Sequence, residues 1–522
     1  TRLFYAATAV ENLVVFGSDV SNAFGEAPGP AQGAYLRPDR AFHNWWKKKG
    51  RTPIPHNFVI PVQRAMQGHP ESPRLWEKHI DGILRKLGLT PTVHEPCLYE
   101  GTVDGKRILF LRQVDDFAIA APDQRTADIL LDMIDDELSM PIKRQGPVEL
   151  FNGINVDQTK YYIKLHCETY INRINEKHIA TWFNDAKLAK DRPLPFPTTG
   201  EFAKEFPTTV GDPDEKHQAK LAKTMNCSYR NLVGELTYAM VTCRPDLSPA
   251  VGRLAQHNAA PAEIHYKAAK HCMRYLYATR SDGLIFWRTA PRDDLPEKDT
   301  PKPVSNDHDL LPTGRSNHGP YDLHANTDSD WASCPRTRRS WTGICARLGG
   351  GSIGYKTRFQ PTIALSSTEA EFMAACDAGK MLLYIRSILW DLKIPQESAS
   401  YIYEDNNGAT AMANAGKPTT RTRHMDIRYF ALCDWVEQDL MLLERVDTSQ
   451  NMADHFTKCL DRVAFYRHTD YIMGRVAPSY SPLYKPGYVT NAPAAAAAKL
   501  TLEYPDATAW IYCVQQQEAF GF

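Results

Sequence analysis

The sequence has 522 residues, of which 43% are hydrophobic and 23% charged, and a single hydrophobic core stops growing at roughly 250 to 300 residues. Two or more domains are therefore expected, and this composition excludes a disordered or fibrous protein. The 61 Lys and Arg residues balance 61 Asp and Glu residues, so any binding to nucleic acid must depend on local basic patches rather than on net charge.

Strands and an acidic turn are predicted in the first part of the chain. Asp104-Gly105 lies between two strand-like runs, which is a strong signal for a two-residue hairpin. The next strand meets Val114-Asp115-Asp116, and a second apolar run begins at Phe117. Asp115 and Asp116 are thus expected at the bend between two mostly buried strands, where adjacent carboxylates are costly unless a cation lies beside them.

Asp19 has a similar setting, because it follows the apolar run Leu13–Phe16. Two-metal polymerases need at least two carboxylates to hold Mg²⁺ ions roughly 3.5 to 4 Å apart, so Asp19, Asp115 and Asp116 are candidate catalytic residues and metal ligands. Phe24 follows Asp19 by five residues, and its ring is a candidate for excluding the 2′-hydroxyl of a ribonucleotide. A lone Asp pair in a turn is usually a solvated loop, so the assignment depends on the surrounding motifs.

Those motifs resemble the reverse transcriptase family. The residues that carry the resemblance are Asp19-Val20 with Ala23-Phe24, then Gln67-Gly68 followed by Ser72-Pro73, and then Val114-Asp115-Asp116. The resemblance implies that Gln67 and Gly68 line the site of the incoming nucleotide. Gln113 stands where the family usually has an aromatic residue, and this departure concerns primer contacts and copying rate rather than metal binding.

The middle of the chain is predicted to be helical between two connectors. Apolar residues recur at helical spacing in Leu232, Leu236 and Met240, and again further along residues 221–286. Segments 192–216 and 288–320 are rich in Pro and polar residues, which is typical of connectors between domains.

Four acids in the last part of the chain are candidate catalytic residues and metal ligands. They are Asp328 on a predicted strand, Glu371 on a long helix after Ser366-Ser367-Thr368, Asp405 at a strand end and Asp454 at the start of the final helix. Acids that converge from separate elements form a cage for two hard cations, which would support hydrolysis of a phosphodiester. Glu369 and Glu371 point roughly 200° apart on a helix, and periodicity does not choose between them.

The element order and the acids resemble the RNase H fold. In that fold the helix motif is Glu, an apolar residue, Met or Leu, and Ala-Ala, which Glu371-Phe372-Met373-Ala374-Ala375 matches. The resemblance therefore favours Glu371 over Glu369. Arg421, Arg423 and His424 follow the predicted site and are more typical of a solvated or packed surface.

Further motifs resemble the Pol protein of copia-type LTR retrotransposons over roughly residues 1 to 475. They are Tyr229–Tyr238, Arg244-Pro245-Asp246-Leu247, Ala364–Glu371 and Asn451–Lys458. In that family a protease and an integrase precede the reverse transcriptase, and the basic strands of the fingers precede the first catalytic Asp. The protease, the integrase and the basic strands of the fingers are not found before Asp19, so we expect a chain truncated at its front.

The resemblance predicts a multidomain protein of the α+β and α/β classes. A reverse transcriptase palm with partial fingers is expected at 1–186, a helical thumb or connection at 187–286 and a linker at 287–320. An RNase H-like mixed sheet with flanking helices is expected at 321–474, followed by a loosely ordered tail at 475–522 that contains an Ala-rich run.

The expected function is RNA-directed DNA polymerisation with RNase H activity, using two Mg²⁺ or Mn²⁺ ions in each site. The expected partners are an RNA template, a DNA primer, the RNA-DNA hybrid and dNTPs, with integrase and capsid products of the same polyprotein. The apolar runs are shorter than the roughly 18 residues of a membrane span, so no membrane partner is expected. The resemblance implies a cytoplasmic virus-like particle with later transfer to the nucleus.

Two alternatives remain. One is a decayed or repurposed element copy that binds nucleic acid without catalysis, and the other retains RNase H activity only. Candidate grips on a nucleic-acid backbone are Lys47–Lys49 with Arg51 beside Trp45-Trp46, and the cluster Arg336, Arg338 and Arg339. The alternative for either cluster is a solvated surface.

Overall fold

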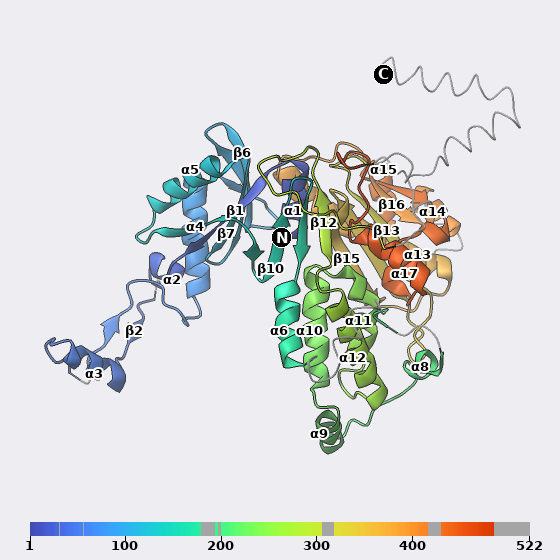
Figure 1. Ribbon diagram of the computed structural model, residues 1–522, viewed down its shortest axis with the longest axis horizontal. Coiled ribbons are helices and arrows are strands. Elements are labelled where there is room, and N and C mark those ends of the chain that lie inside the picture. Colours follow the sequence, from blue (N-terminus) through green and yellow to red (C-terminus); the bar gives the residue numbers. More distant parts are fainter. Residues whose placement is uncertain are drawn as a thin grey trace, which may run out of the picture.

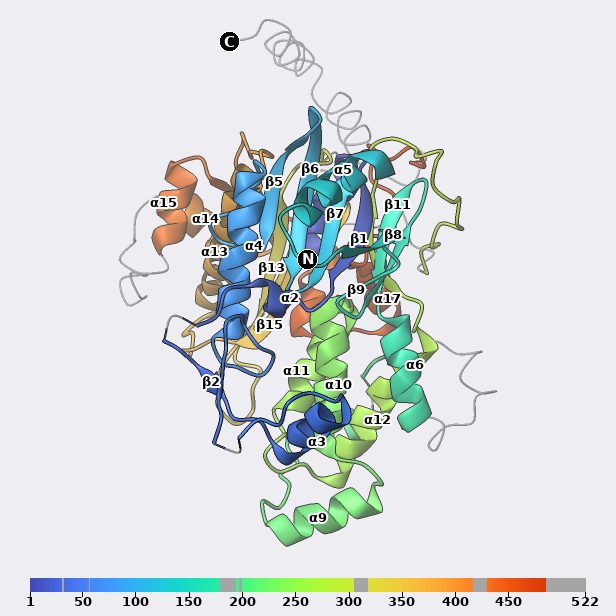
Figure 2. The ribbon, with the colours of Figure 1, turned by 90° about the vertical axis from the view of Figure 1, so that its left-hand side faces the viewer.

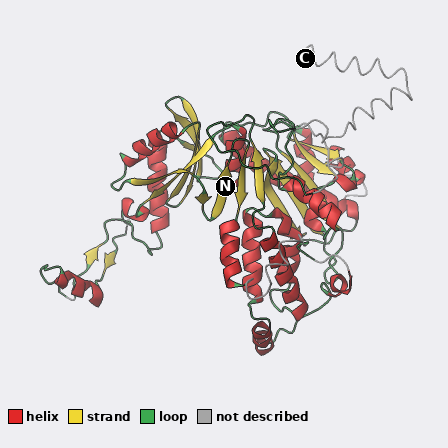
Figure 3. Ribbon diagram, viewed as in Figure 1, coloured by secondary structure: helices red, strands yellow, loops and turns green. Residues whose placement is uncertain are grey.

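The computed structural model describes residues 1–30, 32–55, 57–178, 194–196, 200–304, 318–415 and 430–484. These residues form a mixed α/β protein, in which three sheets of four to six strands and one two-stranded ribbon are connected by helices (Figure 3). None of the helices in the described part of the chain is both long and apolar enough to cross a membrane.

The first sheet is antiparallel and has six strands in the order β4-β5-β6-β7-β1-β8. Its strands are β1 (Val14–Val20), β4 (Thr90–Pro91), β5 (Leu98–Val103), β6 (Lys106–Gln113), β7 (Asp116–Ala121) and β8 (Ile142–Pro147). Asp104 and Gly105 connect β5 and β6 with φ angles of 51° and 71°. This conformation, which suits Asp and Gly, confirms the predicted two-residue hairpin.

Both faces of the first sheet are buried. Phe16, Phe110 and Ile119 pack on one face, which α4 (Ser72–Lys86) and α5 (Gln124–Asp135) cover. Their strand neighbours, such as Val15 and Leu109, pack on the other face with α1 (Arg2–Val10). Successive side chains of a strand point to opposite faces, so the nearly continuous apolar runs in β1, β6 and β7 follow from this double covering.

Between β1 and α4 the chain leaves the sheet. This segment consists of α2 (Ala23–Glu26), the paired strands β2 (Tyr35–Leu36) and β3 (Ile60–Pro61), and α3 (Arg40–Lys48). Figure 1 shows α3 at the end of an arm that projects away from the rest of the molecule. No residue of α3 is buried, so its side chains are available to solvent or to a partner.

The second sheet is antiparallel and has the order β12-β11-β10-β9. Its strands are β9 (Leu150–Phe151), β10 (Ile154–Gln158), β11 (Tyr162–His166) and β12 (Gly283–Trp287). Because β12 pairs with β11, residues on both sides of the proposed boundary at 186 share one sheet. Arg288, at the start of the predicted linker, is buried and donates hydrogen bonds to the carbonyls of Thr159 and Leu13, so this residue is fixed against the second sheet and the start of β1.

Helices lie between β11 and β12 in the sequence, as the apolar spacing predicts. They are α6 (Glu168–Lys177), α8 (Gly200–Glu205), α9 (Glu215–Thr224), α10 (Tyr229–Thr242), η2 (Pro245–Leu247), α11 (Ser248–Ala255) and α12 (Glu263–Ala278). We call residues 229–279, from α10 to the C-cap of α12, the helical unit. Its apolar positions Leu232, Leu236 and Cys272 are fully buried, which explains why this segment packs although several of its helices are short.

The third sheet is mixed, with the order β15-β14-β13-β16-β17. Its strands are β13 (His324–Asp330), β14 (Trp341–Leu348), β15 (Gly351–Phe359), β16 (Ser400–Glu404) and β17 (Met441–Arg445). Strands β13, β14 and β15 are antiparallel, whereas β13, β16 and β17 are parallel. Gly349 and Gly350, with φ angles of 63° and 80°, form the turn between β14 and β15.

Helices pack around the third sheet (Figure 2). They are α13 (Ser367–Asp391), α14 (Asn407–Asn414), α15 (Ala431–Glu437), η5 (Thr448–Gln450), α16 (Asp454–Thr457) and α17 (Arg462–Ile472). The long helix α13 begins as predicted, because the Ser366 side chain accepts a hydrogen bond from the backbone N–H of Glu369 at 3.1 Å.

Two expectations near the end of the chain are wrong. Asp454 begins the short helix α16 rather than the final helix, because the chain turns before Asp461, whose side chain caps α17. The tail is not loosely ordered from residue 475: Arg475 is buried and forms ion pairs with Asp470 and Asp282. Residues 485–522, including the Ala-rich run, lie outside the described residues.

Candidate active sites

Three of the acids singled out from the sequence converge on the third sheet. Asp328 lies on β13, Glu371 lies in the second turn of α13, and Asp405 directly follows β16. One carboxylate oxygen from each lies within 4.8 Å of the others. Parallel pairing of β13 with β16 brings Asp328 and Asp405 to the same edge, and α13 packs across these strands. The geometry therefore suits a divalent cation held by oxygen ligands.

Glu371 and Glu369 occupy different environments, as their helical spacing requires. Glu371 is 6% exposed, whereas Glu369 is only partly buried and accepts a hydrogen bond from the backbone N–H of Leu365 at 2.7 Å. Burial, together with Glu404, Asp328 and Asp405, raises the pKa of Glu371 well above its usual range. Glu371 is thus the acid of this pair that faces the other carboxylates.

Glu404 is a buried acid that the sequence reasoning missed. It is fully buried at the end of β16, and burial followed by the charges of Asp405 and Asp328 raises its pKa well above the usual range. Strand periodicity is a signal that could have found it, because Glu404 shares a face with the buried Ile402. We call Asp328, Glu371, Glu404, Asp405 and Asp454 the acidic cluster.

Asp454 is linked to the other acids through the ammonium group of Lys458. Lys458 Nζ lies 2.6 Å from Asp454 Oδ1 and 3.6 Å from Asp328 Oδ1. Burial followed by the charge of Asp328 raises the pKa of Asp454 to about 7, and Lys458 opposes this rise. Thr457 donates a hydrogen bond from its hydroxyl to Asp328 Oδ2. Lys458 was part of a motif in the sequence but was not recognised as a member of the site.

The other three acids, Asp19, Asp115 and Asp116, lie together where strands β1 and β7 of the first sheet meet the turn before β7. Asp19 on β1 is directly opposite Asp116 on β7, and the backbone N–H of Val20 donates to the Asp115 carbonyl at 2.9 Å. Asp115 is exposed in the turn, where Val114 has a φ of 58° and its carbonyl accepts a hydrogen bond from Trp76 Nε1 at 2.7 Å. Burial, then Asp115, then Asp19 raises the pKa of Asp116.

The proposed nucleotide-contacting residues lie on the chain between β1 and α4. Phe24 is partly buried on α2, while Gln67 and Gly68 are exposed in the turn before α4. The two segments are joined by backbone hydrogen bonds, including Ala65 N–H to the Ala27 carbonyl at 3.0 Å. Gly68 has a φ of 89°, a conformation that favours Gly.

Both basic clusters are exposed. Lys47 and Lys48 end α3, and the Arg51 guanidinium lies over the Trp46 ring at 4.6 Å. Arg336, Arg338 and Arg339 occupy the connection between β13 and β14. Arg421, Arg423 and His424 lie outside the described residues.

Comparison with known proteins relates the first part of the chain to a family and most of the chain to transposon polyproteins. Residues 1–188 match the family described as "Reverse transcriptase (RNA-dependent DNA polymerase)". The chain is 27% identical over 417 residues to the retrovirus-related Pol polyprotein from transposon TNT 1-94 of Nicotiana tabacum, a match that covers 78% of this chain and 28% of the relative. It is also 27% identical over 434 residues to the polyprotein from transposon RE1 of Arabidopsis thaliana, covering 81% and 25%.

Residues 1–188 therefore belong to the reverse transcriptase family, and most of the chain is homologous to the Pol polyproteins of copia-type transposons. This confirms the resemblance drawn from the motifs. The chain spans about a quarter of the length of these relatives.

Proposed function

We propose that this chain is an RNA-directed DNA polymerase with RNase H activity, which copies a retrotransposon RNA into DNA and hydrolyses the RNA of the resulting hybrid. The observation that carries the proposal is the convergence of Asp328, Glu371 and Asp405, whose carboxylate oxygens lie within 4.8 Å of one another. Homology to transposon Pol polyproteins over most of the chain supports the same conclusion.

The acidic cluster fits the binding of divalent cations, namely Mg²⁺ or Mn²⁺. Buried oxygens of Glu371 and Glu404, both named Oε2, have no hydrogen-bond partner, and a buried carboxylate without compensation is costly. Asp328, Glu371, Asp405 and Asp454 are the residues that would hold the ions. When bound, such ions activate a water molecule and stabilise the leaving oxygen of a phosphodiester.

The protein's own residues prepare this site. The Thr457 hydroxyl orients the Asp328 carboxylate, and the Lys458 ammonium group balances part of the negative charge of Asp328 and Asp454. The Ser366 cap defines the start of α13, and the packing of α13 against β13 places Glu371 beside the strand that carries Asp328. The substrate class would be an RNA-DNA hybrid, in which the 2′-hydroxyl distinguishes the RNA strand.

For polymerisation we propose that Asp19, Asp115 and Asp116 hold two further divalent ions. Phe24 would contact the sugar of the incoming dNTP, and Gln67 with Gly68 would line its site. The direct opposition of Asp19 and Asp116 across β1 and β7 supports this assignment, since a two-metal site needs carboxylates from separate elements at one edge. An RNA template and a DNA primer would lie across this edge.

The proposed domain organisation assigns the first sheet and its helices to the palm with partial fingers, and the helical unit to the thumb or connection. The third sheet with its helices would be the RNase H-like domain. The larger setting remains a proposal: integrase and capsid products of the same polyprotein as partners, and a cytoplasmic virus-like particle with later transfer to the nucleus.

The experiment that tests the nuclease proposal is the cleavage of an RNA-DNA hybrid labelled on the RNA strand in Mg²⁺. Asp328→Asn and Glu371→Gln should each reduce cleavage by about 100-fold or more, because several kcal/mol of charge stabilisation are lost. Glu369→Gln is the matched control on the same helix, and it should cleave like the wild type.

The outcomes separate the alternatives. Hybrid cleavage without dNTP incorporation would identify a protein with RNase H activity only. Binding of the hybrid without either reaction would identify a decayed or repurposed copy. Equal cleavage by the wild type and Asp328→Asn would assign the activity to something other than the acidic cluster.

A further inference from the structure

A buried ion pair lies in the helical unit, next to the third sheet. Arg244 and Asp246 flank Pro245, the first residue of η2, and their side chains are 0% and 1% exposed. The guanidinium donates two hydrogen bonds to the carboxylate, from Nε at 2.9 Å and from Nη2 at 2.7 Å. A planar pair with two parallel hydrogen bonds is held more rigidly than a single contact.

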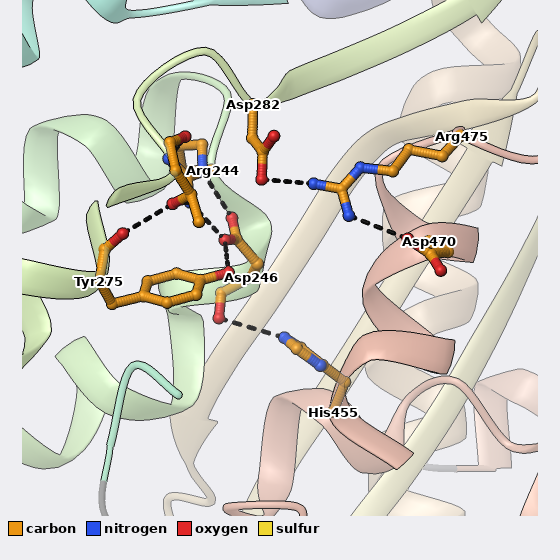
Figure 4. Close-up of polar contacts among 8 residues, drawn as sticks. Arg244, Asp246, Tyr275, Asp282, His455, Asp470 and Arg475 are labelled. Atoms are coloured by element: carbon orange, nitrogen blue, oxygen red, sulfur yellow. Dashed lines mark hydrogen bonds and ion pairs between the residues drawn. The ribbon is translucent and has the colours of Figure 1, made fainter. Parts of the chain in front are cut away.

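Further bonds fix this ion pair within the helical unit (Figure 4). Tyr275 on α12 donates its hydroxyl to Asp246 Oδ2 at 2.6 Å, and Arg244 Nη1 donates to the Thr279 carbonyl at 3.0 Å. Both oxygens of the Asp246 carboxylate thus accept hydrogen bonds within the unit. As a result, the backbone of η2 is held at a defined position.

The backbone of η2 is bonded in turn to α16. The Asp246 carbonyl accepts a hydrogen bond from His455 Nε2 at 3.2 Å, across 209 residues of sequence. A carbonyl oxygen can only accept, so the proton of the imidazole lies on Nε2 in this contact. A second bond joins the helical unit to α16, from Arg253 Nη2 on α11 to the Thr457 carbonyl at 3.2 Å.

Helix α16 carries one member of the acidic cluster and one residue that is bonded to it. Asp454 directly precedes His455, and Thr457 donates its hydroxyl to Asp328. The helix has only four residues, so its own hydrogen bonds cannot hold it in place and its position depends on its neighbours. It also packs against β13 and β14.

We infer that Arg244, Asp246 and His455 are positioning residues for the acidic cluster, so that the helical unit sets the place of Asp454 and Thr457. This inference rests on the proposed nuclease function of the cluster. It means that the domain boundary drawn from the sequence divides the site from part of its scaffold. The geometry of the proposed nuclease site therefore depends on the helical unit, which is proposed as the thumb or connection.

The test compares His455→Gln with His455→Leu in the full chain. The Gln side chain can place an amide N–H near the position of Nε2, whereas Leu leaves the buried Asp246 carbonyl without a donor. We expect His455→Leu to lower kcat for hybrid cleavage and to raise the Mg²⁺ concentration that gives the half-maximal rate. The two changes multiplied together should amount to about 10- to 100-fold. The KM for the hybrid should stay unchanged, and His455→Gln should recover most of the loss.

His271→Leu is the matched control for general destabilisation. His271 Nε2 on α12 contacts the Leu194 carbonyl at 2.8 Å, which is the same kind of bond made by the helical unit to a segment other than α16. This variant should lower the melting temperature but leave the Mg²⁺ dependence unchanged. Tyr275→Phe, which removes one bond to Asp246, should shift the Mg²⁺ dependence in the same direction as His455→Leu and by less.

A second readout keeps the inference separate from the proposed function. The rise in melting temperature on adding Mg²⁺ should be smaller for His455→Leu than for His455→Gln or His271→Leu, whether or not the wild type cleaves the hybrid. If the wild type shows no cleavage, the proposed function fails and this shift alone decides the inference. The inference is overturned if His455→Leu matches His455→Gln in the Mg²⁺-induced shift.

Discussion

Asp19 and Asp116 are directly opposed residues in the antiparallel pairing of β1 and β7, at the edge of the first sheet. Burial raises the pKa of Asp116, and the charges of Asp115 and Asp19 raise it further. Three carboxylates at one sheet edge repel one another, and a bound divalent ion would relieve that repulsion.

This relationship predicts that the two proposed activities can be separated by mutation. Asp116→Asn should lower dNTP incorporation on a primed RNA template by about 100-fold or more, because a proposed metal ligand is lost. Hybrid cleavage should persist, since the acidic cluster is on another sheet. Asp104→Asn, in the neighbouring hairpin of the same sheet, is the control. Loss of cleavage in Asp116→Asn would argue that the two sites are not independent.

The proposed role of Phe24 predicts how the protein selects dNTPs over ribonucleotides. If its ring lies against the sugar, Phe24→Ala should incorporate ribonucleotides more readily and reduce the preference for dNTPs by about 10-fold or more, equivalent to roughly 1.4 kcal/mol. The measurement is the ratio of kcat/KM for a dNTP and the matching rNTP. Phe58→Ala, at an exposed position on the arm, is the control. An unchanged ratio would show that Phe24 serves only in packing.

The ion pairs of Lys458 predict that the charge balance in the acidic cluster affects the binding of divalent cations. Lys458→Met should destabilise the metal-free protein by about 1 to 2 kcal/mol, between the values typical of exposed and buried ion pairs. The stabilisation on adding Mg²⁺ should increase, because the carboxylates are left with less positive charge. Urea unfolding with and without Mg²⁺ measures both. Lys267→Met, which removes an exposed pair with Glu263, should have almost no effect.

The stacked pair His257 and His265 predicts a loss of stability in acid. Their ring centroids lie 3.6 Å apart, and burial followed by the charge of His265 lowers the pKa of His257 to about 4. The unfolded chain, with a His pKa of about 6.5, therefore binds more protons between these values. The contribution of His257 is present above pH 6.5 and is lost as the pH falls toward 4.

Urea unfolding at pH 7 and pH 4.5 tests this expectation. His257→Phe, which keeps an aromatic ring but cannot titrate, should lose roughly 2 kcal/mol less on acidification than the wild type. His217→Phe, at an exposed position on α9, should follow the wild type. If His257→Phe is as sensitive to acid as the wild type, His257 does not contribute to the loss.

The basic residues of α3 predict the salt dependence of nucleic-acid binding. The arm carries Lys47, Lys48 and Lys49 away from the body, with exposed Trp45 beside them. Replacing the three Lys residues by Gln should weaken hybrid binding and reduce the slope of log K against log salt by about 1 for each phosphate that the arm no longer neutralises. The slope could instead stay unchanged in this variant and fall after replacement of Arg336, Arg338 and Arg339. That result would place the phosphate binding at the third sheet.

Local patterns allowed much of the fold to be predicted. Turn residues such as Asp104-Gly105 and Gly349-Gly350 determine hairpins because few residues adopt positive φ angles, and apolar spacing predicted α10 and α12. The break between α16 and α17 was missed, since a four-residue helix carries too little periodicity to be recognised.

The amino-acid sequence by itself determined the order of elements and the acids Asp328, Glu371 and Asp405 that the fold brings together, because motifs and turns are local. Tertiary structure alone decided that Glu404 and Lys458 join these acids, and that His455 is bonded to Asp246 across 209 residues. Such interactions depend on which distant surfaces pack together. The burial and charge that shift these carboxyl pKa values arise only once the sheet and the helical unit have assembled around them.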